Sequence, residues 1–214
     1  MKRKFWRKKL MAMTVLMSLL LSATGCSEDP DAQTSSTKSG GSGDSWVIYW
    51  YLCGSDLESN AAAATTDLQE MLQVTLPENV KVVIQTGGAK KWQNDQVKAD
   101  RLQRYEYSGN TLELKDEADQ ASMGDPATLK DFLKYGEENY QADHKMLLFW
   151  NHGGGSVSGA AFDELHGLDS LDLAEMYQAF DAVWPADKDA PALELIGFDT
   201  CLMATVDVLS LIHI

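Results

Sequence analysis

The sequence has few basic residues once its first nine positions are set aside. Six of the 18 Lys and Arg lie before residue 10, whereas all 32 Asp and Glu occur at Glu28 or later. The chain after Cys26 therefore carries 12 basic and 32 acidic residues, a net charge of −20. A phosphate backbone would repel a body this acidic, so we expect no nucleic-acid partner. Glycine and proline, at 16 and 5 residues, are too few for a collagen-like or proline-rich chain.

The amino-terminal segment lacks an apolar run of membrane-spanning length. Residues 10–21 form an apolar run of only 12 residues, whereas a spanning helix needs about 20. A basic head, this short run and the small residues that follow it are typical of a secretory signal peptide. The small residues Ser22–Gly25 directly before Cys26 resemble a bacterial lipobox, which implies that Cys26 becomes the lipid-modified first residue of the mature protein. We therefore assign residues 1–26 to a lipoprotein signal peptide; a plain cleaved signal peptide and an uncleaved anchor are the alternatives.

Residues 27–45 contain no aromatic residue and no aliphatic residue larger than Ala. Such a segment cannot bury enough apolar surface to offset its chain entropy, so we expect a flexible tether. The folded domain is then predicted over residues 46–214, held by a lipid on the outer side of a bacterial membrane.

Strand-like and helix-like patterns alternate along this domain. Unbroken apolar runs suit strands that are buried on both faces, and apolar residues at helical spacing suit helices packed on them. The patterns predict strands over residues 46–53, 79–88, 145–150 and 191–198, a hairpin over 101–115, helices over 57–74, 126–140, 171–183 and 201–211, and a loop over 159–167. This order indicates an α/β fold with a mainly parallel sheet.

Two reactive residue types follow buried strands. His152 comes directly after LLFWN, and Cys201 comes after ELIGFDT, 49 residues later with a predicted helix between them. In parallel sheets, functional groups gather beyond the carboxyl ends of the strands. A nucleophilic thiol needs a nearby base or cation to hold it as thiolate, and the N–H groups of the glycines after His152 and of Cys201 suit an oxyanion. The spacing therefore predicts a catalytic pair of His152 and Cys201.

Other interpretations of these residues stay open at this point. A lone His at a strand end is often structural, and a lone Cys is often an inert buried thiol. The same inert role is expected for Cys53, although an exported protein could instead pair Cys53 with Cys201 in a disulfide. A metal site is a further alternative, but its candidate ligands match no closed zinc pattern. Those ligands are His152, Asp163, Glu164 and His166.

Three segments of the chain resemble the clostripain family of cysteine peptidases. They are WVIYWYLCGSDLE at residues 46–58, LLFWNHGGG, and IGFDTCLMA, and the resemblance extends from about Trp46 to Ala204. It implies a caspase-like αβα sandwich and an endopeptidase that cleaves protein or peptide substrates after Arg or Lys.

The resemblance also implies roles for individual residues. His152 takes the role of general acid and base, and Cys201 that of nucleophile. Gly153 and Cys201 supply the oxyanion-hole amides, and Asp199 lines the pocket for the basic substrate side chain. A carboxylate two residues before the nucleophile can pair with a guanidinium or ammonium. Without the resemblance, a helix N-cap is the favoured explanation of Asp199. No metal or other cofactor is required, and the calcium dependence of the family's type member keeps calcium open, although no loop has an EF-hand pattern.

The sequence departs from the family pattern in two ways. Lys188 is the only Lys or Arg between His152 and Cys201, so we expect a single chain, or cleavage by another protease, rather than self-processing. The sequence ends 13 residues after Cys201, where a caspase-like fold normally continues. We therefore expect a C-terminally truncated domain that keeps the dyad and is inactive if the missing strands are needed. A non-enzymatic, surface-anchored binding lipoprotein is the alternative function.

Overall fold

The computed structural model describes residues 44–185 and 192–213. The predicted signal peptide, its lipidation site Cys26, nearly all of the tether, and Lys188 lie outside the described residues. Within the described ranges, no helix combines the length and the apolar character needed to cross a bilayer.

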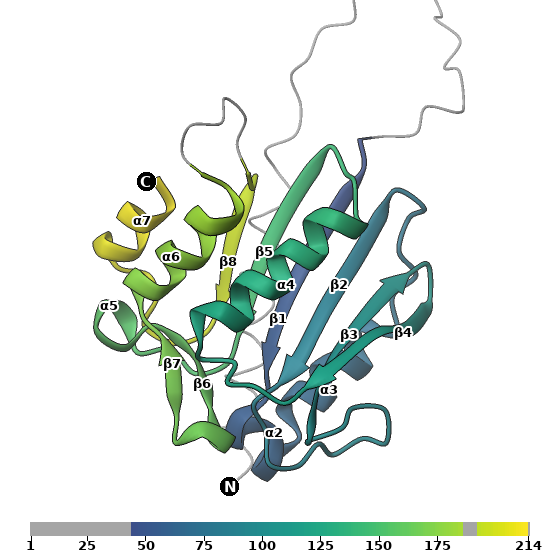
Figure 1. Ribbon diagram of the computed structural model, residues 1–214. Helices are drawn as coiled ribbons and strands as arrows, with labels where there is room; N and C mark the ends of the chain where they lie inside the picture. Colours follow the sequence, from purple (N-terminus) through teal and green to yellow (C-terminus); the bar gives the residue numbers. More distant parts are fainter. Residues whose placement is uncertain (1–43, 186–191, 214) are drawn as a thin grey trace, which may run out of the picture. The chain divides into compact units, whose positions relative to one another are not determined.

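A six-stranded sheet in the order β4-β3-β2-β1-β5-β8 forms the centre of the domain (Figure 1). Its strands are β1 (Trp46–Cys53), β2 (Val80–Gly87), β3 (Arg101–Ser108), β4 (Thr111–Asp119), β5 (His144–Trp150) and β8 (Leu195–Asp199). Strands β2, β1, β5 and β8 are parallel to their neighbours within this group, and the β3–β4 hairpin adds two antiparallel strands at one edge. The predicted mainly parallel sheet is confirmed.

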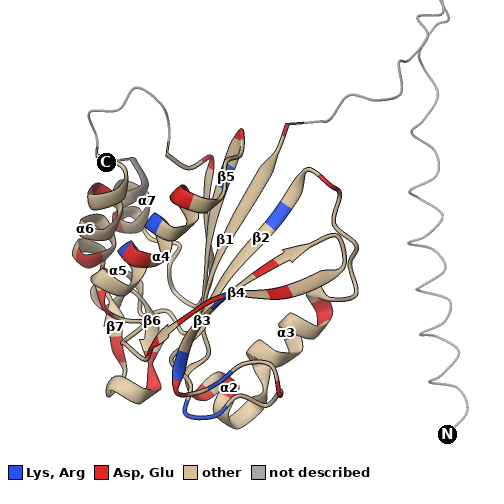
Figure 2. Cartoon of the chain, turned by 45° about the vertical axis from the view of Figure 1, so that its right-hand side comes forward, with Lys and Arg blue, Asp and Glu red and all other residues tan. Residues whose placement is uncertain are grey.

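Strand β1 is buried on both faces, as its unbroken apolar sequence predicts. Val47, Tyr49 and Tyr51 point into one apolar core, which also holds Phe132 and Leu133 of helix α4 (Pro126–Asn139). The alternate residues of β1, Trp50 and Leu52, point into a second core on the other face, with Ala64 and Leu68 of helix α3. This alternation follows from the two-residue period of a strand. It places helices on both faces of the sheet, which Figures 1 and 2 show as α4 and α6 on one side and α3 on the other.

The helix predicted over residues 57–74 is two helices. Helix α2 covers Ser55–Ala61 and helix α3 covers Ala63–Met71. Ala62 between them has a left-handed backbone, with φ of 56°, and a right-handed helix cannot continue through that conformation. The first turn of α2 also has no side-chain cap, although the sequence Gly54-Ser55-Asp56 indicates one.

The chain after β5 contains more regular structure than the sequence predicts. The segment predicted as a loop, residues 159–167, forms strand β6 (Ala160–Asp163) and a short 3-10 helix (Glu164–His166). Strand β6 pairs with β7 (Asp169–Leu171) in a separate two-stranded sheet. Helix α5 (Gly155–Ser158) precedes this hairpin. Helix α6 (Leu173–Val183) follows it, as predicted, and opens with a capping box formed by Asp172 and Glu175.

Two further boundaries differ near the end of the chain. Strand β8 is Leu195–Asp199, shorter than the predicted strand over 191–198 at its amino end. The predicted helix over 201–211 begins later, because helix α7 covers Val206–His213. Leu202 has φ of 61°, which keeps the residues directly after Cys201 out of a right-handed helix. Cys201 therefore lies in a loop between β8 and α7.

Candidate active site

His152 and Cys201 follow neighbouring strands at the same edge of the sheet. Strands β5 and β8 pair in parallel, and Trp150 and Asp199 form the last pair in their register. Each of the two predicted site residues lies two positions beyond this pair. The adjacency of the two strands, inferred from a single intervening helix, is therefore confirmed. Helix α2, helix α5 and the β6–β7 hairpin lie beyond this edge (Figure 1).

The backbones of the two loops touch at Gly153. A Cβ atom at Gly153 would lie only 1.9 Å from the carbonyl oxygen of Cys201 and 3.0 Å from Cβ of Thr200. No residue other than glycine fits there, because the clash is with backbone and cannot be relieved by a side-chain rotation. Gly155 has φ of 66°, and a Cβ there would lie 3.2 Å from the carbonyl oxygen of Leu202, a tight but less severe contact. The glycines after His152 thus allow the histidine loop to lie directly against the cysteine loop.

Asn151 fixes the start of the histidine loop. Its side chain is buried, donates to the Cys53 carbonyl at 2.7 Å, and accepts from the Phe162 N–H at 2.7 Å. Its backbone N–H donates to the Asp199 carbonyl at 3.4 Å. Through its side chain and its backbone N–H together, Asn151 therefore connects the ends of β1, β5 and β8 to strand β6. The sequence analysis did not single out Asn151, although it stands directly before His152 in the NHGGG segment.

His152 pairs with an acidic residue from helix α2. Its Nε2 lies 2.8 Å from Oδ1 of Asp56, and the edge of its ring meets the Phe162 ring, with centroids 6.4 Å apart. The hydrogen bond from His152 is the largest cause that lowers the pKa of Asp56, which keeps this carboxylate ionised. The other ring nitrogen, Nδ1, makes no hydrogen bond to any described residue. Asp56 is a second residue that the sequence reasoning missed.

Cys201 is exposed and its thiol is free. No hydrogen bond joins this thiol to the His152 imidazole among the described residues, so the catalytic pairing of the two side chains stays a prediction. Catalytic hydrogen bonds are often long before substrate binds.

Asp199 ends strand β8 and its side chain is exposed. The N-cap interpretation of Asp199 is wrong, because α7 begins only at Val206 and its first turn is capped by Thr205, whose Oγ1 accepts from the Val208 N–H. Asp199 is thus available for a different role at the site.

Cys53 is the buried thiol that the sequence suggests. It is fully buried and donates to the Phe162 carbonyl at 3.4 Å. Burial raises its pKa, and the nearby Asp163 carboxylate adds to the effect. Both Cys53 and Cys201 are free, so the alternative disulfide between them is not formed.

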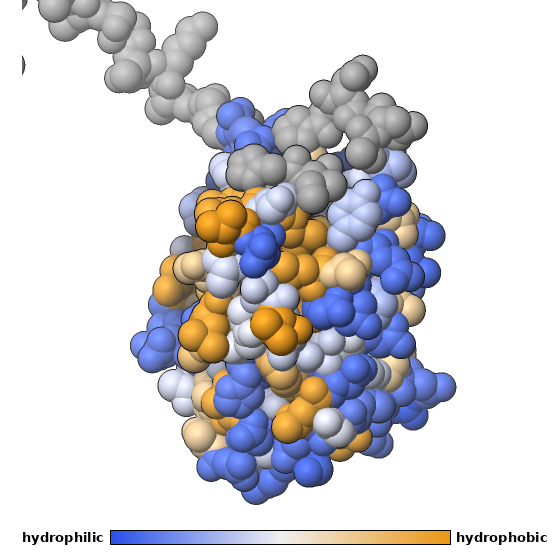
Figure 3. Space-filling view, turned by 90° about the vertical axis from the view of Figure 1, so that its left-hand side faces the viewer, coloured by the Kyte–Doolittle hydropathy of each residue, from blue (hydrophilic) through white to orange (hydrophobic). Residues whose placement is uncertain are grey.

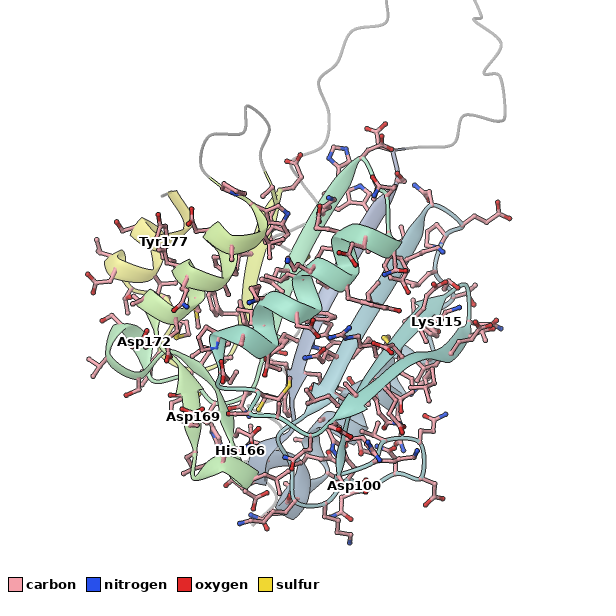
Figure 4. All side chains as sticks on the ribbon, in the orientation of Figure 1. Asp100, Lys115, His166, Asp169, Asp172 and Tyr177 are labelled. Carbon is pink, nitrogen blue, oxygen red and sulfur yellow. The ribbon has the colours of Figure 1, made fainter. Side chains whose placement is uncertain are left out.

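The four residues of the metal-site alternative do not form one cluster, and only His166 and Asp163 among them form an ion pair in the described ranges, with Nδ1 3.2 Å from Oδ1. Asp163 is buried and accepts from the backbone N–H groups of Met123, Leu165 and His166. Glu164 instead accepts from Ser59 and pairs with Lys90. Figure 4 shows His166 at the β6–β7 hairpin. Among residues 44–185 and 192–213, no group of three or more His, Cys, Asp and Glu is arranged to hold a metal ion.

A shallow groove of about 300 Å³ lies between α6 and α7, away from the predicted site residues. It is lined by Leu173, Ala174, Tyr177, Asp207, Ser210 and Leu211. Val206 and Leu209 of α7 are exposed apolar side chains. Figure 3 shows hydrophobic side chains gathered on the face that it presents. The residues that line this groove include none of His152, Asp199 and Cys201.

Residues 50–212 match the model of the clostripain family. The chain belongs to this family. Clostripain from Hathewaya histolytica is 33% identical over 96 residues, which cover 42% of this chain and 18% of that protein. The match includes the LLFWNHGGG and IGFDTCLMA segments within its range.

Solved structures of cysteine proteases share the fold of this clostripain-family chain. A secreted cysteine protease from Bacteroides thetaiotaomicron, in complex with an irreversible peptide inhibitor, has a TM-score of 0.58 and 19% identity over 79% of this chain. An inactive zymogen from Parabacteroides distasonis has a TM-score of 0.54 and 17% identity over the same share. This chain covers 46% of each of those chains, so it spans less than half of their length. The expected caspase-like αβα sandwich is confirmed.

Proposed function

We propose that this chain carries the catalytic residues of an endopeptidase whose nucleophile is Cys201 and whose general base is His152. The observation that carries the proposal is the backbone contact between Gly153 and Cys201, which joins the two loops beyond neighbouring parallel strands. An exposed thiol and an imidazole with one unoccupied nitrogen lie on these loops. Because the chain spans 46% of the inhibitor-bound Bacteroides thetaiotaomicron protease and 18% of the Hathewaya histolytica clostripain, the activity of the whole protein belongs to the proposal.

The chemistry runs through an acyl-enzyme. His152 takes the proton of the Cys201 thiol through Nδ1, and Sγ attacks the carbonyl carbon of the scissile peptide bond. The imidazolium then gives this proton to the leaving amine, and the carbon–nitrogen bond breaks. Water, deprotonated by the same imidazole, attacks the thioester, which releases the carboxylate product and returns the proton to Cys201.

The N–H groups of Gly153 and Cys201 serve as the oxyanion hole in this mechanism. Neither donates a hydrogen bond to another described residue. The tight approach of Gly153 to the Cys201 carbonyl keeps the two amides on adjoining backbone. Donors that are already in place when charge develops on the substrate oxygen lower the barrier most.

Asp199 gives the enzyme its preference for Arg or Lys before the cleaved bond. Its exposed carboxylate stands two residues before the nucleophile, at the end of β8. An ionised carboxylate recognises a guanidinium or ammonium by a charge-assisted hydrogen bond. The acidic side chains spread over α3, α4 and α6 (Figure 2) raise the local concentration of basic substrates.

Export and lipid anchoring complete the proposal. The amino-terminal pattern and Cys26 support it, as does the relative from Bacteroides thetaiotaomicron that is named as secreted. Metabolic labelling with an alkyne fatty acid tests the anchor: we expect label on the protein and none on Cys26→Ser. Label that survives this substitution contradicts the anchor and leaves the peptidase proposal untouched.

The peptidase proposal is tested with a peptidyl acyloxymethyl ketone that carries Lys or Arg beside its reactive group. We expect covalent labelling of Cys201, detected by mass spectrometry, and hydrolysis of Lys and Arg peptides but not of Leu peptides. Cys201→Ala abolishes both, whereas Cys53→Ala serves as the matched control and keeps both. Hydrolysis that survives in Cys201→Ala contradicts the proposal. A non-enzymatic binding protein would show neither labelling of Cys201 nor hydrolysis. Activity compared with and without a calcium chelator tests whether calcium supports the enzyme.

A further inference from the structure

The turn that leads from β1 into the first residues of helix α2, which carry Asp56, is hydrogen-bonded to the sheet. The Gly54 N–H donates to the Gly87 carbonyl of β2 at 2.9 Å. Ser55 itself is fully buried with φ of 52°, a left-handed conformation that costs about 1–2 kcal/mol for a residue with a Cβ. Backbone held in such a conformation by its surroundings is typical of functional sites.

The Asp56 carboxylate in this segment forms a hydrogen bond with His152. Asp56 Oδ1 accepts from His152 Nε2 at 2.8 Å and from the Ser55 hydroxyl at 3.2 Å. An ionised carboxylate can only accept, so Nε2 must carry the hydrogen in this pair. In a neutral imidazole the lone pair is then on Nδ1, the nitrogen that makes no hydrogen bond among the described residues.

Stability alone is a weak reason for this pair. The side chains of His152 and Asp56 are 41% and 46% exposed, and ion pairs this exposed contribute about 0–1 kcal/mol. No other charged side chain of the described residues forms an ion pair with His152. The hydrogen bond to Asp56 and the Phe162 ring that packs against His152 instead fix the orientation of the imidazole.

We propose that Asp56 is the positioning residue of His152. It holds the tautomer with hydrogen on Nε2, so that Nδ1 is the nitrogen that takes the Cys201 proton. This inference rests on the proposed function, because it assigns a role within the same reaction. Asp56 touches neither substrate nor thiol and acts only through the imidazole.

The first test is the rate of the reaction in three variants. Asp56→Asn keeps the size of the side chain but offers an N–H in place of one oxygen. We expect it to lower kcat about 10- to 100-fold with little change in KM, because it impairs part of the general acid–base contribution of His152. Asp56→Glu restores a carboxylate and should recover most of this loss. The matched control is Glu194→Gln, which removes a carboxylate from His144 at the opposite end of β5. It should leave kcat unchanged.

The second test reads the imidazole directly and needs no activity. Nitrogen-15 NMR of the folded protein at alkaline pH should show His152 with hydrogen on Nε2, and Asp56→Asn should shift the population toward hydrogen on Nδ1. Hydrogen on Nδ1 in the unmodified protein overturns the proposal. So does a kcat for Asp56→Asn within twofold of the unmodified enzyme. A protein that shows the expected tautomer yet never labels at Cys201 contradicts the peptidase function and leaves the pairing of Asp56 with His152 intact.

Discussion

Strand β5 has a histidine at each end, and the two are held differently. His144, at the amino end, has both ring nitrogens occupied, by Glu194 at 3.2 Å and Asp44 at 3.3 Å. Its ring also stacks on Trp46, with centroids 4.6 Å apart. His152, beyond the carboxyl end, has one nitrogen paired with Asp56 and the other unoccupied by any described residue.

The difference separates a structural histidine from a reactive one. An imidazole with both nitrogens paired to carboxylates is stabilised as a cation, and the pKa of His144 is raised, mainly by its hydrogen bond to Glu194 and then by that to Asp44. Such a group has no site left for a proton to be exchanged with a substrate. An imidazole with one fixed and one open nitrogen is suited to move a proton. The sequence context of the two histidines does not reveal this difference, because their carboxylate partners are all distant in the chain: Glu194 is 50 and Asp44 is 100 residues from His144, and Asp56 is 96 residues from His152.

The largest expected effect comes from removing each histidine in turn. His152→Ala should lower kcat about 100- to 10,000-fold, because general acid–base catalysis contributes that much. His144→Ala, the matched control, should keep kcat within about twofold while lowering the melting temperature slightly. Steady-state kinetics on a Lys peptide measures the first effect and calorimetry the second. Equal losses of kcat in the two variants would contradict the assignment of His152 as reactive and His144 as structural.

The contact at Gly153 gives the next largest effect. Gly153→Ala places a Cβ 1.9 Å from the Cys201 carbonyl and must push the two loops apart, and a displacement of about 1 Å costs about 100-fold in rate. Gly109→Ala in the β3–β4 turn is the control, since its φ of 58° makes alanine strained while no atom lies within 4 Å. It should lose about 1 kcal/mol of stability and no activity. Full activity in Gly153→Ala would mean that the loops need not touch.

Stability should respond more to the carboxyl end of β5 than to the amino end. Asn151→Ala leaves the Cys53 carbonyl and Phe162 N–H without their buried partner, which costs about 1–3 kcal/mol. Ser45→Ala removes two exposed hydrogen bonds of the Ser45 hydroxyl, which donates to the Asp143 carboxylate and accepts from the Asp143 N–H, and should cost about 0.5 kcal/mol or less. Urea denaturation of both variants measures their free energies of unfolding. Similar values would contradict a role of Asn151 in connecting the strand ends.

The smallest expected effect is a pH dependence at His144. Because its folded pKa is raised above 6.5, its pairing stabilises the protein fully below the unfolded pKa and ceases to do so as pH rises through the folded pKa. The difference in melting temperature between the unmodified protein and Glu194→Gln should therefore be larger near about pH 5.5 than near about pH 9, and added salt should reduce it. A difference that grows with pH would contradict this sign.

Local pattern predicts the strands of this fold well. The run Trp46–Cys53 is apolar throughout, and it is β1 with the same bounds. The Asp125-Pro126 signal places the start of α4 correctly, with Asp125 accepting from the Ala127 N–H. Buried strands and helix caps depend on residues that are neighbours in the chain. The sheet, and the placement of His152 and Cys201 at its edge, can therefore be predicted from the sequence.

Features set by distant contacts could not be predicted in this way. Ala62 and Leu202 take left-handed backbones that their residue types do not signal, so the helix break and the late start of α7 were missed. Asp56 is 96 residues from His152 in the chain, and the pattern around it indicates only a helix start. The site could thus be located from local pattern, whereas the partners that hold it could not.

The reactivity of Cys201 as a function of pH tests the central claim most directly. Iodoacetamide is added to the folded protein at a series of pH values, and alkylation of Cys201 is followed by mass spectrometry, with the buried Cys53 as internal reference. We predict that Cys201 is alkylated much faster than Cys53 across the series and that this reactivity is lost in His152→Ala. Alkylation of Cys201 with an ordinary thiol profile, unchanged by His152→Ala, would contradict the claim that the two loops form a cysteine–histidine site.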